Sequence, residues 1–186
     1  INIGSLNAAG FNYSWTPVTG LNNAAISNPT ITLSNAGNSP LTYQYYLTAS
    51  NGNCIAFDTV SITVNPIPVS SFTAFPDTIC AGDLVQVNFN GAAGSSAIYN
   101  WNFASGNIIS GSGAGPYQVQ YNNGGTYSLN LDIDDLGCLS SVNNQIIVRD
   151  LPVAAFTLSP AACNSDTVQI NFTGIVDPAS VFNWNF

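Results

Sequence analysis

Histidine, lysine, glutamate and methionine are absent from these 186 residues, and Arg149 is the only cation. Without histidine, no Ser–His or Cys–His pair can activate a nucleophile, and without lysine there is neither a Schiff base nor a phosphate-loop lysine. One arginine cannot neutralise the phosphates of a nucleic acid, and a net charge of -8 opposes binding to an anionic membrane surface. These absences exclude nucleic-acid binding, membrane-surface binding and the common forms of nucleophilic catalysis.

Charged residues of any kind are scarce, at 5% of the chain against about 25% in ordinary soluble domains. Hydrophobic residues make up 46%, which is enough for a folded core. Strong helix formers are few, whereas Val, Ile, Thr, Tyr and Phe, which favour strands, are plentiful. No apolar run approaches the roughly 18 residues of a membrane-spanning helix. The composition predicts an all-β protein with a surface of Asn, Ser, Thr, Gln and Gly.

A repeat of about 84 residues runs through the chain. The blocks IPVSSFTAFPDTIC and LPVAAFTLSPAAC begin at positions 67 and 151, and 151 − 67 = 84. YNWNF and FNWNF begin at 99 and 182, and 182 − 99 = 83. The cysteines that end LTYQYYLTASNGNC and GTYSLNLDIDDLGC stand at 54 and 138, and 138 − 54 = 84. The alternative is chance similarity of low-complexity sequence, which does not produce matched blocks at a nearly constant offset.

The repeat predicts three domains. Residues 1–66 are expected to form a repeat that lacks its first strands, residues 67–150 a complete repeat, and residues 151–186 the N-terminal strands of a third repeat that is cut short. These are named below the N-terminal, middle and C-terminal segments. A unit of this size suits a small β-sandwich. The joints NPIP and RDLP are short and proline-stiffened, so neighbouring domains are expected to be held in a line.

Short alternating runs between turn residues predict seven strands in the middle segment. Val85, Val87 and Phe89 alternate with polar residues, and so do Leu129 and Leu131. One apolar face and one polar face is the pattern of two antiparallel sheets packed face to face. The expected strands lie near 69–75, 84–90, 97–103, 107–110, 116–121, 125–134 and 142–148. The fold class predicted is tandem immunoglobulin-like β-sandwiches.

Four cysteines stand at positions 54, 80, 138 and 163. The absence of histidine and of a C-x-x-C motif argues against a zinc site, and buried free thiols remain an alternative. Each repeat places one cysteine before its second strand and one after its sixth, so we expect a disulfide between Cys80 and Cys138. Such a loop stabilises by roughly 4 kcal/mol and indicates an oxidising compartment. Cys54 and Cys163 are then expected to be single, with partners outside these residues.

Two stretches carry a resemblance to a known family. YNWNFASGN from Tyr99, followed by PYQVQYNNGGTYSLNLDI, resembles the PKD domain, whose hallmark is W-D-F-G-D-G and then a Y-x-V-x-L-x-V strand. YSWTPVTGLNNAAISNPTITL from Tyr13 resembles the W-x-P-x-x-G-L…N-P variant of giant surface proteins of Bacteroidota. The hallmark is altered here, because Asn102 replaces Asp, Ala104 replaces Gly and Ser105 replaces the second Asp. The hairpin after the third strand is therefore the least supported part of the resemblance.

The resemblance implies tandem PKD-like or Ig-like modules of a gliding-motility adhesin or similar filament. Such proteins are type IX secretion substrates that are attached to the outer membrane at the cell surface. It also implies O-glycosylation of Asp-Ser/Thr-apolar triplets, although Ser/Thr-rich composition alone produces such triplets; the candidates are Thr59, Thr78 and Thr167. The partners implied are other repeats of the same chain, surface polysaccharide, and the secretion or motility machinery.

Two groups of residues are candidates for a site. The tryptophans expected in the cores, at equivalent positions of the three repeats, are Trp15, Trp101 and Trp184. Sugar stacking by Trp101 is the alternative. The only acidic cluster is Asp132, Asp134 and Asp135, which predicts a solvated strand end and turn. The alternative for this cluster is a weak Ca²⁺ site, since hard carboxylate oxygens suit Ca²⁺.

The sequence thus predicts a protein that is not an enzyme and needs no cofactor, apart from the Ca²⁺ alternative. The first hypothesis is a repeat segment of a large secreted adhesin or filament protein that serves as a rigid stalk or adhesive array. The second is a set of accessory carbohydrate-binding or spacer domains of a secreted hydrolase. A third is a subunit of a larger assembly. Neighbouring domains in the full-length chain would distinguish the first two.

Overall fold

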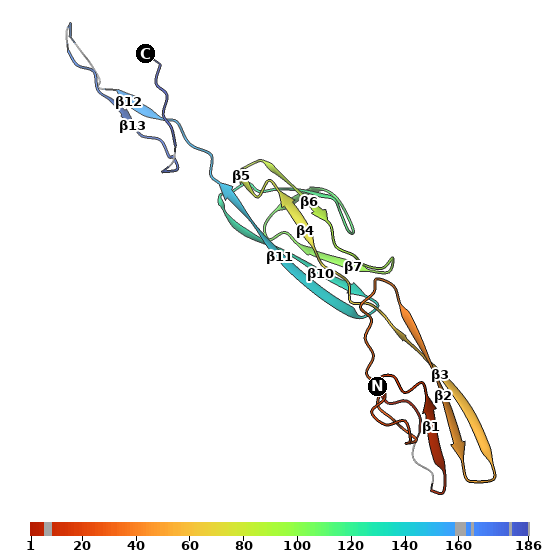
Figure 1. Cartoon of the computed structure of the whole chain (residues 1–186). Helices are drawn as coiled ribbons and strands as arrows, with labels where there is room; N and C mark the ends of the chain where they lie inside the picture. The colour runs from red at the N-terminus through yellow and green to blue at the C-terminus, as the bar shows by residue number, and fades with distance from the viewer. Residues whose placement is uncertain (6–8, 159–162, 165, 179, 186) are drawn as a thin grey trace. The chain divides into compact units, whose positions relative to one another are not determined.

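The computed structural model describes residues 1–5, 9–158, 163–164, 166–178 and 180–185. Figure 1 shows strands, turns and irregular connections throughout these residues. The part of the chain described contains no helix long and apolar enough to cross a membrane. The all-β class predicted from composition is therefore correct.

The middle segment folds into two four-stranded sheets. One sheet has the strand order β5-β11-β10-β7, and the other has the order β4-β6-β9-β8. Their bounds are β4 Phe72–Phe75, β5 Thr78–Cys80, β6 Leu84–Phe89, β7 Ile98–Asn102, β8 Asn107–Ser110, β9 Tyr117–Gln120, β10 Gly125–Asp135 and β11 Cys138–Arg149. The pairs β4–β6, β6–β9 and β8–β9 are antiparallel, whereas β5 runs parallel to β11.

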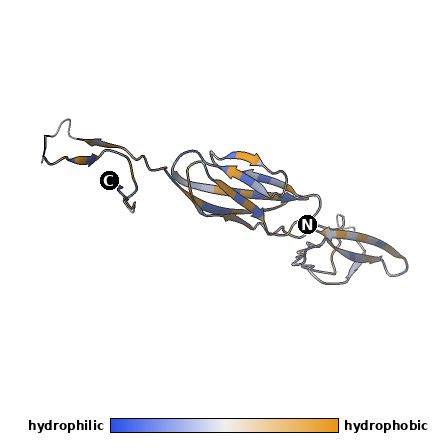
Figure 2. Ribbon diagram, turned by 90° about the horizontal axis from the view of Figure 1, so that it is seen from above, coloured by the Kyte–Doolittle hydropathy of each residue, from blue (hydrophilic) through white to orange (hydrophobic). Residues whose placement is uncertain are grey.

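Alternation along the strands forms the core of this sandwich. Leu129, Leu131 and Ile133 on β10 are fully buried, while the residues between them face outward or are half-buried. Val85 and Val87 on β6 have no exposed surface either. In Figure 2 apolar and polar colours alternate along the strands in the same way. Two half-apolar sheets can hide these side chains from water only by facing each other.

The seven predicted strands are all present, and one further strand was missed. β5 is three residues long, and its ladder joins Thr78 to Ile147 and Cys80 to Arg149. Its strand character depends on pairing with a segment about 70 residues away, which local sequence does not reveal. β11 also begins four residues earlier than the expected 142, at Cys138.

Among its described residues, the N-terminal segment contains a sheet of three strands. β1 (Asn12–Thr16) pairs with β2 (Leu41–Ser50), and β2 pairs with β3 (Ile55–Val64), both antiparallel. The buried core against this sheet consists of Ile3, Trp15, Ile31 and Tyr45. The indole nitrogen of Trp15 donates to the carbonyl of Ile26 at 2.9 Å, and the hydroxyl of Tyr45 donates to the carbonyl of Thr19 at 2.7 Å. The loop that follows β1 therefore closes over these rings.

The C-terminal segment contains a two-stranded sheet, β12 (Phe156–Leu158) and β13 (Ile170–Phe172). Its register repeats that of β4 and β6, because Phe156 lies opposite Phe172 as Phe72 lies opposite Phe89. The ring contact of Phe72 with Trp101, at 5.0 Å, is likewise matched by one of Phe156 with Trp184, at 5.9 Å. The sequence repeat therefore reproduces strand register and aromatic packing as well as residue types.

A buried tyrosine makes the middle segment sensitive to alkali. Tyr121 is 1% exposed, and its hydroxyl donates to the carbonyl of Phe103 at 3.1 Å. Burial first, and the neighbouring Tyr127 second, raise the pKa of Tyr121 to about 12. An unfolded tyrosine loses its proton near pH 10. Between about pH 10 and 12 the unfolded state therefore binds fewer protons than the folded state, so stability falls as pH rises through this window.

We expect Tyr121→Phe to remove about 2 kcal/mol of the stability that the protein loses between pH 9 and pH 11.5. The variant also loses one buried hydrogen bond, which lowers stability by about 1 kcal/mol at every pH. Burial raises the pKa values of Tyr45 and Tyr117 too, so a smaller alkaline loss persists. The measurement is hydrogen exchange of β9 and β10 peptides at both pH values, corrected for intrinsic exchange. An unchanged alkaline loss in the variant would contradict the assignment.

Candidate functional site

The altered hallmark W-N-F-A-S-G forms a tight turn between β7 and β8. The side-chain oxygen of Asn102 accepts from the backbone N–H of Ala104 at 2.8 Å and so caps the turn. Ala104 has φ 54, a left-handed conformation that glycine adopts more easily. At Gly106 a Cβ would stand 2.5 Å from Val119 and 2.6 Å from Tyr121, so glycine is required there. The Asn102 cap and the close approach at Gly106 together define this turn.

The predicted disulfide between Cys80 and Cys138 is wrong, since all four cysteines are free thiols. Cys80 lies opposite Arg149 at the last residue of β11, whereas Cys138 is the first residue of that strand. The separation is 149 − 138 = 11 residues, which is about 36 Å along an extended strand. A disulfide needs Cα atoms within about 7 Å. The two cysteines belong to opposite ends of the sandwich, and the disulfide argument for an oxidising compartment falls with the pairing.

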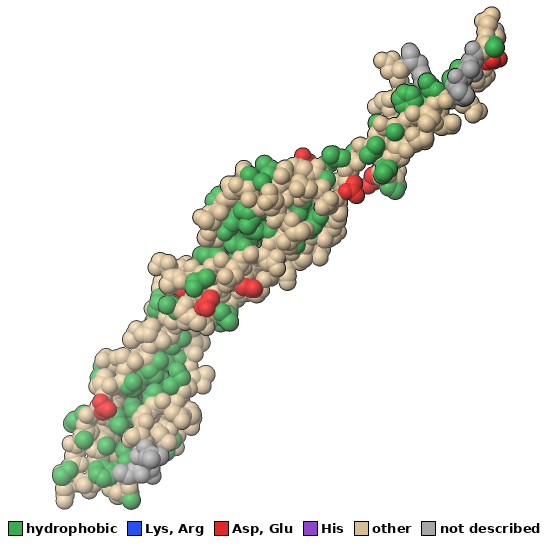
Figure 3. All heavy atoms as spheres, turned by 180° about the vertical axis from the view of Figure 1, so that it is seen from behind, with side chains coloured by type: hydrophobic (Ala, Val, Ile, Leu, Met, Phe, Trp, Pro, Cys, Tyr) green, Lys and Arg blue, Asp and Glu red, His purple; other side chains and the backbone are tan. Residues whose placement is uncertain are grey.

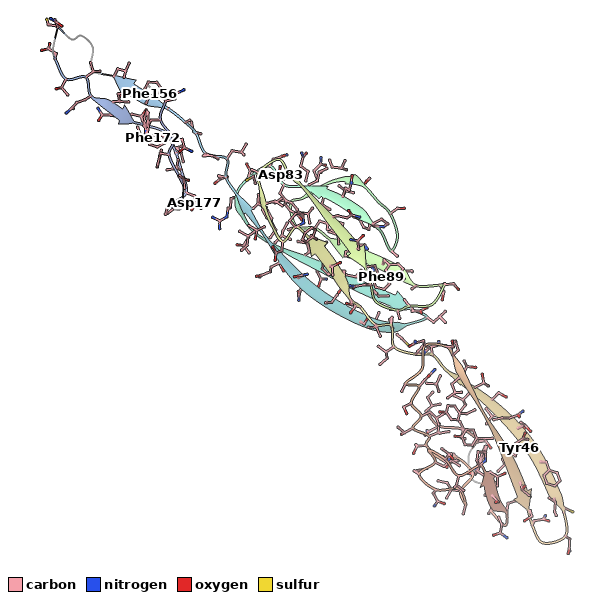
Figure 4. The ribbon with its side chains drawn as sticks, turned by 45° about the horizontal axis from the view of Figure 1, so that its top comes forward. Tyr46, Asp83, Phe89, Phe156, Phe172 and Asp177 are labelled. Carbon is pink, nitrogen blue, oxygen red and sulfur yellow. The ribbon has the colours of Figure 1, made fainter. Side chains whose placement is uncertain are left out.

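Cys80 and Cys163 instead belong to side-chain-capped turns, which sequence reasoning missed. The Asp83 carboxylate accepts from the N–H of Cys80 at 3.2 Å, and the Cys80 carbonyl accepts from the N–H of Asp83 at 3.1 Å. Cys163 and Asp166 make the same pair of bonds at 2.6 and 3.0 Å. The recurrent spacing C-x-x-D was the signal for this turn, and Figure 4 labels Asp83 at its place after β5. Cys54, in the β2–β3 hairpin, is exposed, as is Cys163.

The three carboxylates of the acidic cluster diverge. Asp132 is exposed, and hydrogen bonds from Ser141 and Asn130 lower its pKa. Asp134 accepts from the backbone N–H of Gly137 at 2.9 Å and closes the β10–β11 hairpin. Within the described residues no three Cys, Asp, Glu or His side chains are grouped so that they could hold a metal ion. The structure does not bring the Ca²⁺ candidates together.

Asp135 has a separate role. It is 5% exposed and lies on the same face of β10 as the core residues Leu131 and Ile133. Its carboxylate accepts from the backbone N–H of Gly94 at 2.5 Å and from the Ser96 hydroxyl at 2.9 Å. These bonds fasten the loop before β7 to the end of β10. The alternation 129, 131, 133, 135 was the signal that placed this aspartate inward.

The tryptophans differ in burial. Trp15 is 3% exposed, Trp101 is half-buried, and Trp184 is 45% exposed. The Trp101 ring stacks on the Phe103 ring with 5.4 Å between the ring centroids, and its indole nitrogen donates to the carbonyl of Gly113 at 3.0 Å. The Trp101 ring is therefore engaged within the sandwich and does not form a free platform for a sugar. The three glycosylation candidates Thr59, Thr78 and Thr167 are all exposed.

The C-terminal segment contains an apolar cleft of about 490 Å³. Among its lining residues are Phe156, Phe172, Phe182 and Trp184. Figure 4 labels Phe156 and Phe172, which stand on the paired strands β12 and β13. Phe156 corresponds through the repeat to Phe72, which is buried between the two sheets of the middle segment, so the cleft is lined by core positions of the repeat.

The paired sheets and their alternating core define an immunoglobulin-like β-sandwich protein. No protein-family model and no curated protein matches the chain. A solved structure of Down Syndrome Cell Adhesion Molecule, its N-terminal eight Ig domains, is similar with a TM-score of 0.55 and 9% identity. The match covers 86% of this chain and 23% of that chain, so it spans less than a quarter of the solved eight-domain chain. At this identity the likeness shows the fold alone.

Two further solved structures resemble the chain more loosely. Human Protocadherin-24 EC1-2 has a TM-score of 0.42 at 10% identity, with 76% of this chain and 82% of that chain covered. Murine CEACAM1b has a TM-score of 0.37 at 15% identity, with 78% and 88% covered.

Proposed function

We propose that the chain is a non-catalytic segment of tandem Ig-like repeats in a large secreted cell-surface adhesin or filament protein. The observation that carries this proposal is the recurrence of one strand register at an offset of about 84 residues. Phe72 opposite Phe89 recurs as Phe156 opposite Phe172, so 156 − 72 = 84 and 172 − 89 = 83. Tandem copies of one sandwich are how a chain builds a long stalk from a small domain.

The surface chemistry supports an extracellular repeat of the PKD-like type. The face drawn in Figure 3 is mostly backbone and uncharged polar side chains, with scattered apolar groups and few carboxylates. Thr59, Thr78 and Thr167 stand exposed in Asp-Thr-apolar triplets, where O-glycans would shield strand edges that have few charges to prevent edge-to-edge pairing. In this proposal the protein is exported by the type IX system of Bacteroidota and stays attached to the outer membrane.

The absence of catalytic residue types supports a binding or structural role. His, Lys and Glu do not occur in the chain, and the nine carboxylates are all Asp. Asp135 is committed to two hydrogen bonds and Asp134 closes a turn, so neither is free to act as an acid or base. Carbohydrate binding as an accessory domain is the second candidate. It is favoured only by the exposed ring of Trp184 beside Phe156.

The proposal is tested on intact cells that produce the protein. Antibodies raised against the whole chain are expected to label unpermeabilised cells, and protease added outside is expected to remove the label. Labelling that needs permeabilisation would contradict surface exposure. In parallel, affinity electrophoresis of the chain in gels that contain surface polysaccharides distinguishes the second candidate. Retardation by a polysaccharide that Trp184→Ala abolishes would favour carbohydrate binding over a stalk.

A further inference from the structure

The repeat has two cysteine positions. Cys80 and Cys163 occupy one of them, since 163 − 80 = 83, and are called first cysteines below. Cys54 and Cys138 occupy the other, since 138 − 54 = 84, and are called second cysteines. Both first cysteines lie in the C-x-x-D turn, and both second cysteines lie where β3 or β11 begins. All cysteines of one kind are therefore expected to have the same kind of partner.

The two positions belong to opposite ends of the sandwich. Cys138 lies at the end where the chain enters, because residues 133–140 form part of one compact unit with residues 1–69. Cys80 lies at the end where the chain leaves, because it stands opposite Arg149, the last residue of β11. In a chain of repeats, a short joint such as NPIP connects the exit end of one repeat to the entry end of the next. A first cysteine therefore belongs to the same junction as the second cysteine of the following repeat.

Cys138 contacts the end of the last strand of the preceding repeat. Its thiol lies 4.0 Å from the carbonyl oxygen of Asn65, within reach of a weak S–H···O hydrogen bond. Asn65 directly follows β3, and both residues belong to the same compact unit. The entry end of one repeat thus places its second cysteine against one particular carbonyl of the repeat before it.

The equivalent carbonyl of the middle segment lies beside a first cysteine. Arg149 occupies the position of Asn65, since 149 − 65 = 84. The Arg149 carbonyl accepts from the backbone N–H of Ala81 at 2.8 Å, and Ala81 directly follows Cys80. Standard backbone geometry then puts the Cα of Cys80 within about 5 Å of that oxygen. One carbonyl of the repeat therefore has a first cysteine beside it and receives the second cysteine of the next repeat.

This arrangement meets the reach of a disulfide. A disulfide joins residues whose Cα atoms lie within about 7 Å, a separation that two cysteines around one carbonyl can satisfy. The two cysteines of a single repeat cannot satisfy it, because Cys80 and Cys138 lie about 36 Å apart along β11. Pairs across the junctions use every cysteine of the repeat, whereas pairs within a repeat use none.

We propose, resting on the proposed function of tandem repeats in one chain, that the first cysteine of each repeat forms a disulfide with the second cysteine of the following repeat. Cys80 then pairs with the second cysteine of the next repeat, and Cys138 pairs with the first cysteine of the preceding repeat. Each junction of the stalk is closed by a covalent bond beside its proline-containing joint, so a pulling force on the stalk is shared between the backbone and the disulfide.

An oxidant of the thiol–disulfide exchange class supplies the reaction. The thiolate of one cysteine attacks the disulfide of the oxidant, which forms a mixed disulfide and releases one sulfur of the oxidant as a thiol. The thiolate of the other cysteine then attacks the cysteine sulfur of the mixed disulfide, which forms the bond between repeats and releases the second sulfur of the oxidant. Two protons and two electrons pass from the cysteines to the oxidant, whose disulfide becomes a dithiol.

The test is peptide mapping of the full-length protein, isolated from cells and denatured in a thiol-blocking reagent without reductant. A protease that cleaves before aspartate releases Cys80 in residues 77–82 and Cys138 in residues 135–149, so the two cysteines lie in separate peptides. We expect each peptide to be joined to a peptide from a neighbouring repeat and to appear alone only after reduction. Residues 77–82 joined to residues 135–149, or both cysteines carrying the blocking reagent, overturns the proposal.

Two matched variants assign the partners. Cys80→Ser is expected to leave one free thiol, on the second cysteine of the following repeat, while the link of Cys138 persists. Cys138→Ser is expected to free a first cysteine in the preceding repeat, while the link of Cys80 persists. A free Cys138 thiol in the Cys80→Ser variant contradicts pairing across junctions. Free thiols on a wild-type protein that antibodies label at the cell surface overturn these disulfides and leave the proposed surface function intact.

Discussion

Replacing Leu131 by alanine is expected to destabilise the middle segment by about 3 kcal/mol, the largest effect that we predict for a single side chain. Leu131 is 0% exposed on β10, between Leu129 and Ile133, and faces the sheet that carries Val85 and Val87. Truncation removes the transfer free energy of the lost side-chain carbons and leaves a cavity. Each sheet is held by its own ladder of hydrogen bonds, so the two sheets can close the gap only partly. Hydrogen exchange of β6, β10 and β11 peptides in the whole chain measures the loss.

The matched control is Leu139→Ala. Leu139 lies on the neighbouring strand β11 and is 70% exposed, so the same chemical change should alter stability by less than about 0.5 kcal/mol. If both variants lost the same stability, the sheet that carries β10 and β11 would not face the core as described. If neither did, the middle segment would not be the stable unit of the chain.

Much of this fold follows from local sequence because alternation is a local signal. In the run from Leu129 to Ile133 apolar residues alternate strictly with polar ones, and this period of two predicts both the strand and its buried side. The repeat then predicts a matching strand in the N-terminal segment, where Tyr45 and Leu47 take the places of Leu129 and Leu131.

The parts that local sequence did not predict are those that depend on which strands are neighbours. β5 exists only through its ladder with the far end of β11, so the three residues Thr78–Cys80 carry little signal of their own. The disulfide prediction was wrong for the same reason, because it also depended on which strands are neighbours. Counting cysteines before the second strand and after the sixth says nothing about which end of the sandwich each one occupies, and β11 places Cys80 and Cys138 eleven residues apart.

The acidic cluster shows a mixed outcome. The prediction of a strand end and turn describes Asp134, which caps the hairpin through Gly137. Asp132 and Asp135 point to opposite faces of β10, because residues that differ by an odd number alternate across a strand. Three acidic residues within four positions therefore do not make one site when the backbone is extended.

Asp135→Ala is expected to cost about 2.5 kcal/mol of stability, because a buried carboxylate that accepts two hydrogen bonds is replaced by a methyl group. Gly94 N–H and the Ser96 hydroxyl lose their acceptor together, and the loop before β7 loses its attachment to β10. Asp135→Asn keeps one acceptor oxygen and should lose about 1 kcal/mol. Exchange of the Gly94 amide should rise most, because its bond to the carboxylate is removed directly.

The control for this prediction lies three residues away on the same strand. Asp132→Ala removes an exposed carboxylate of the same charge, so it should lower stability much less than Asp135→Ala does. A loss of equal size in both variants would mean that net charge, and not the two hydrogen bonds, sets the effect. Protection of Gly94 that persisted in Asp135→Ala would show that the loop is held by other contacts. We expect a large loss of stability for Asp135→Ala and a small one for Asp132→Ala. This difference would show that the two hydrogen bonds of Asp135 join the loop after β6 to the sheet of β10 and β11.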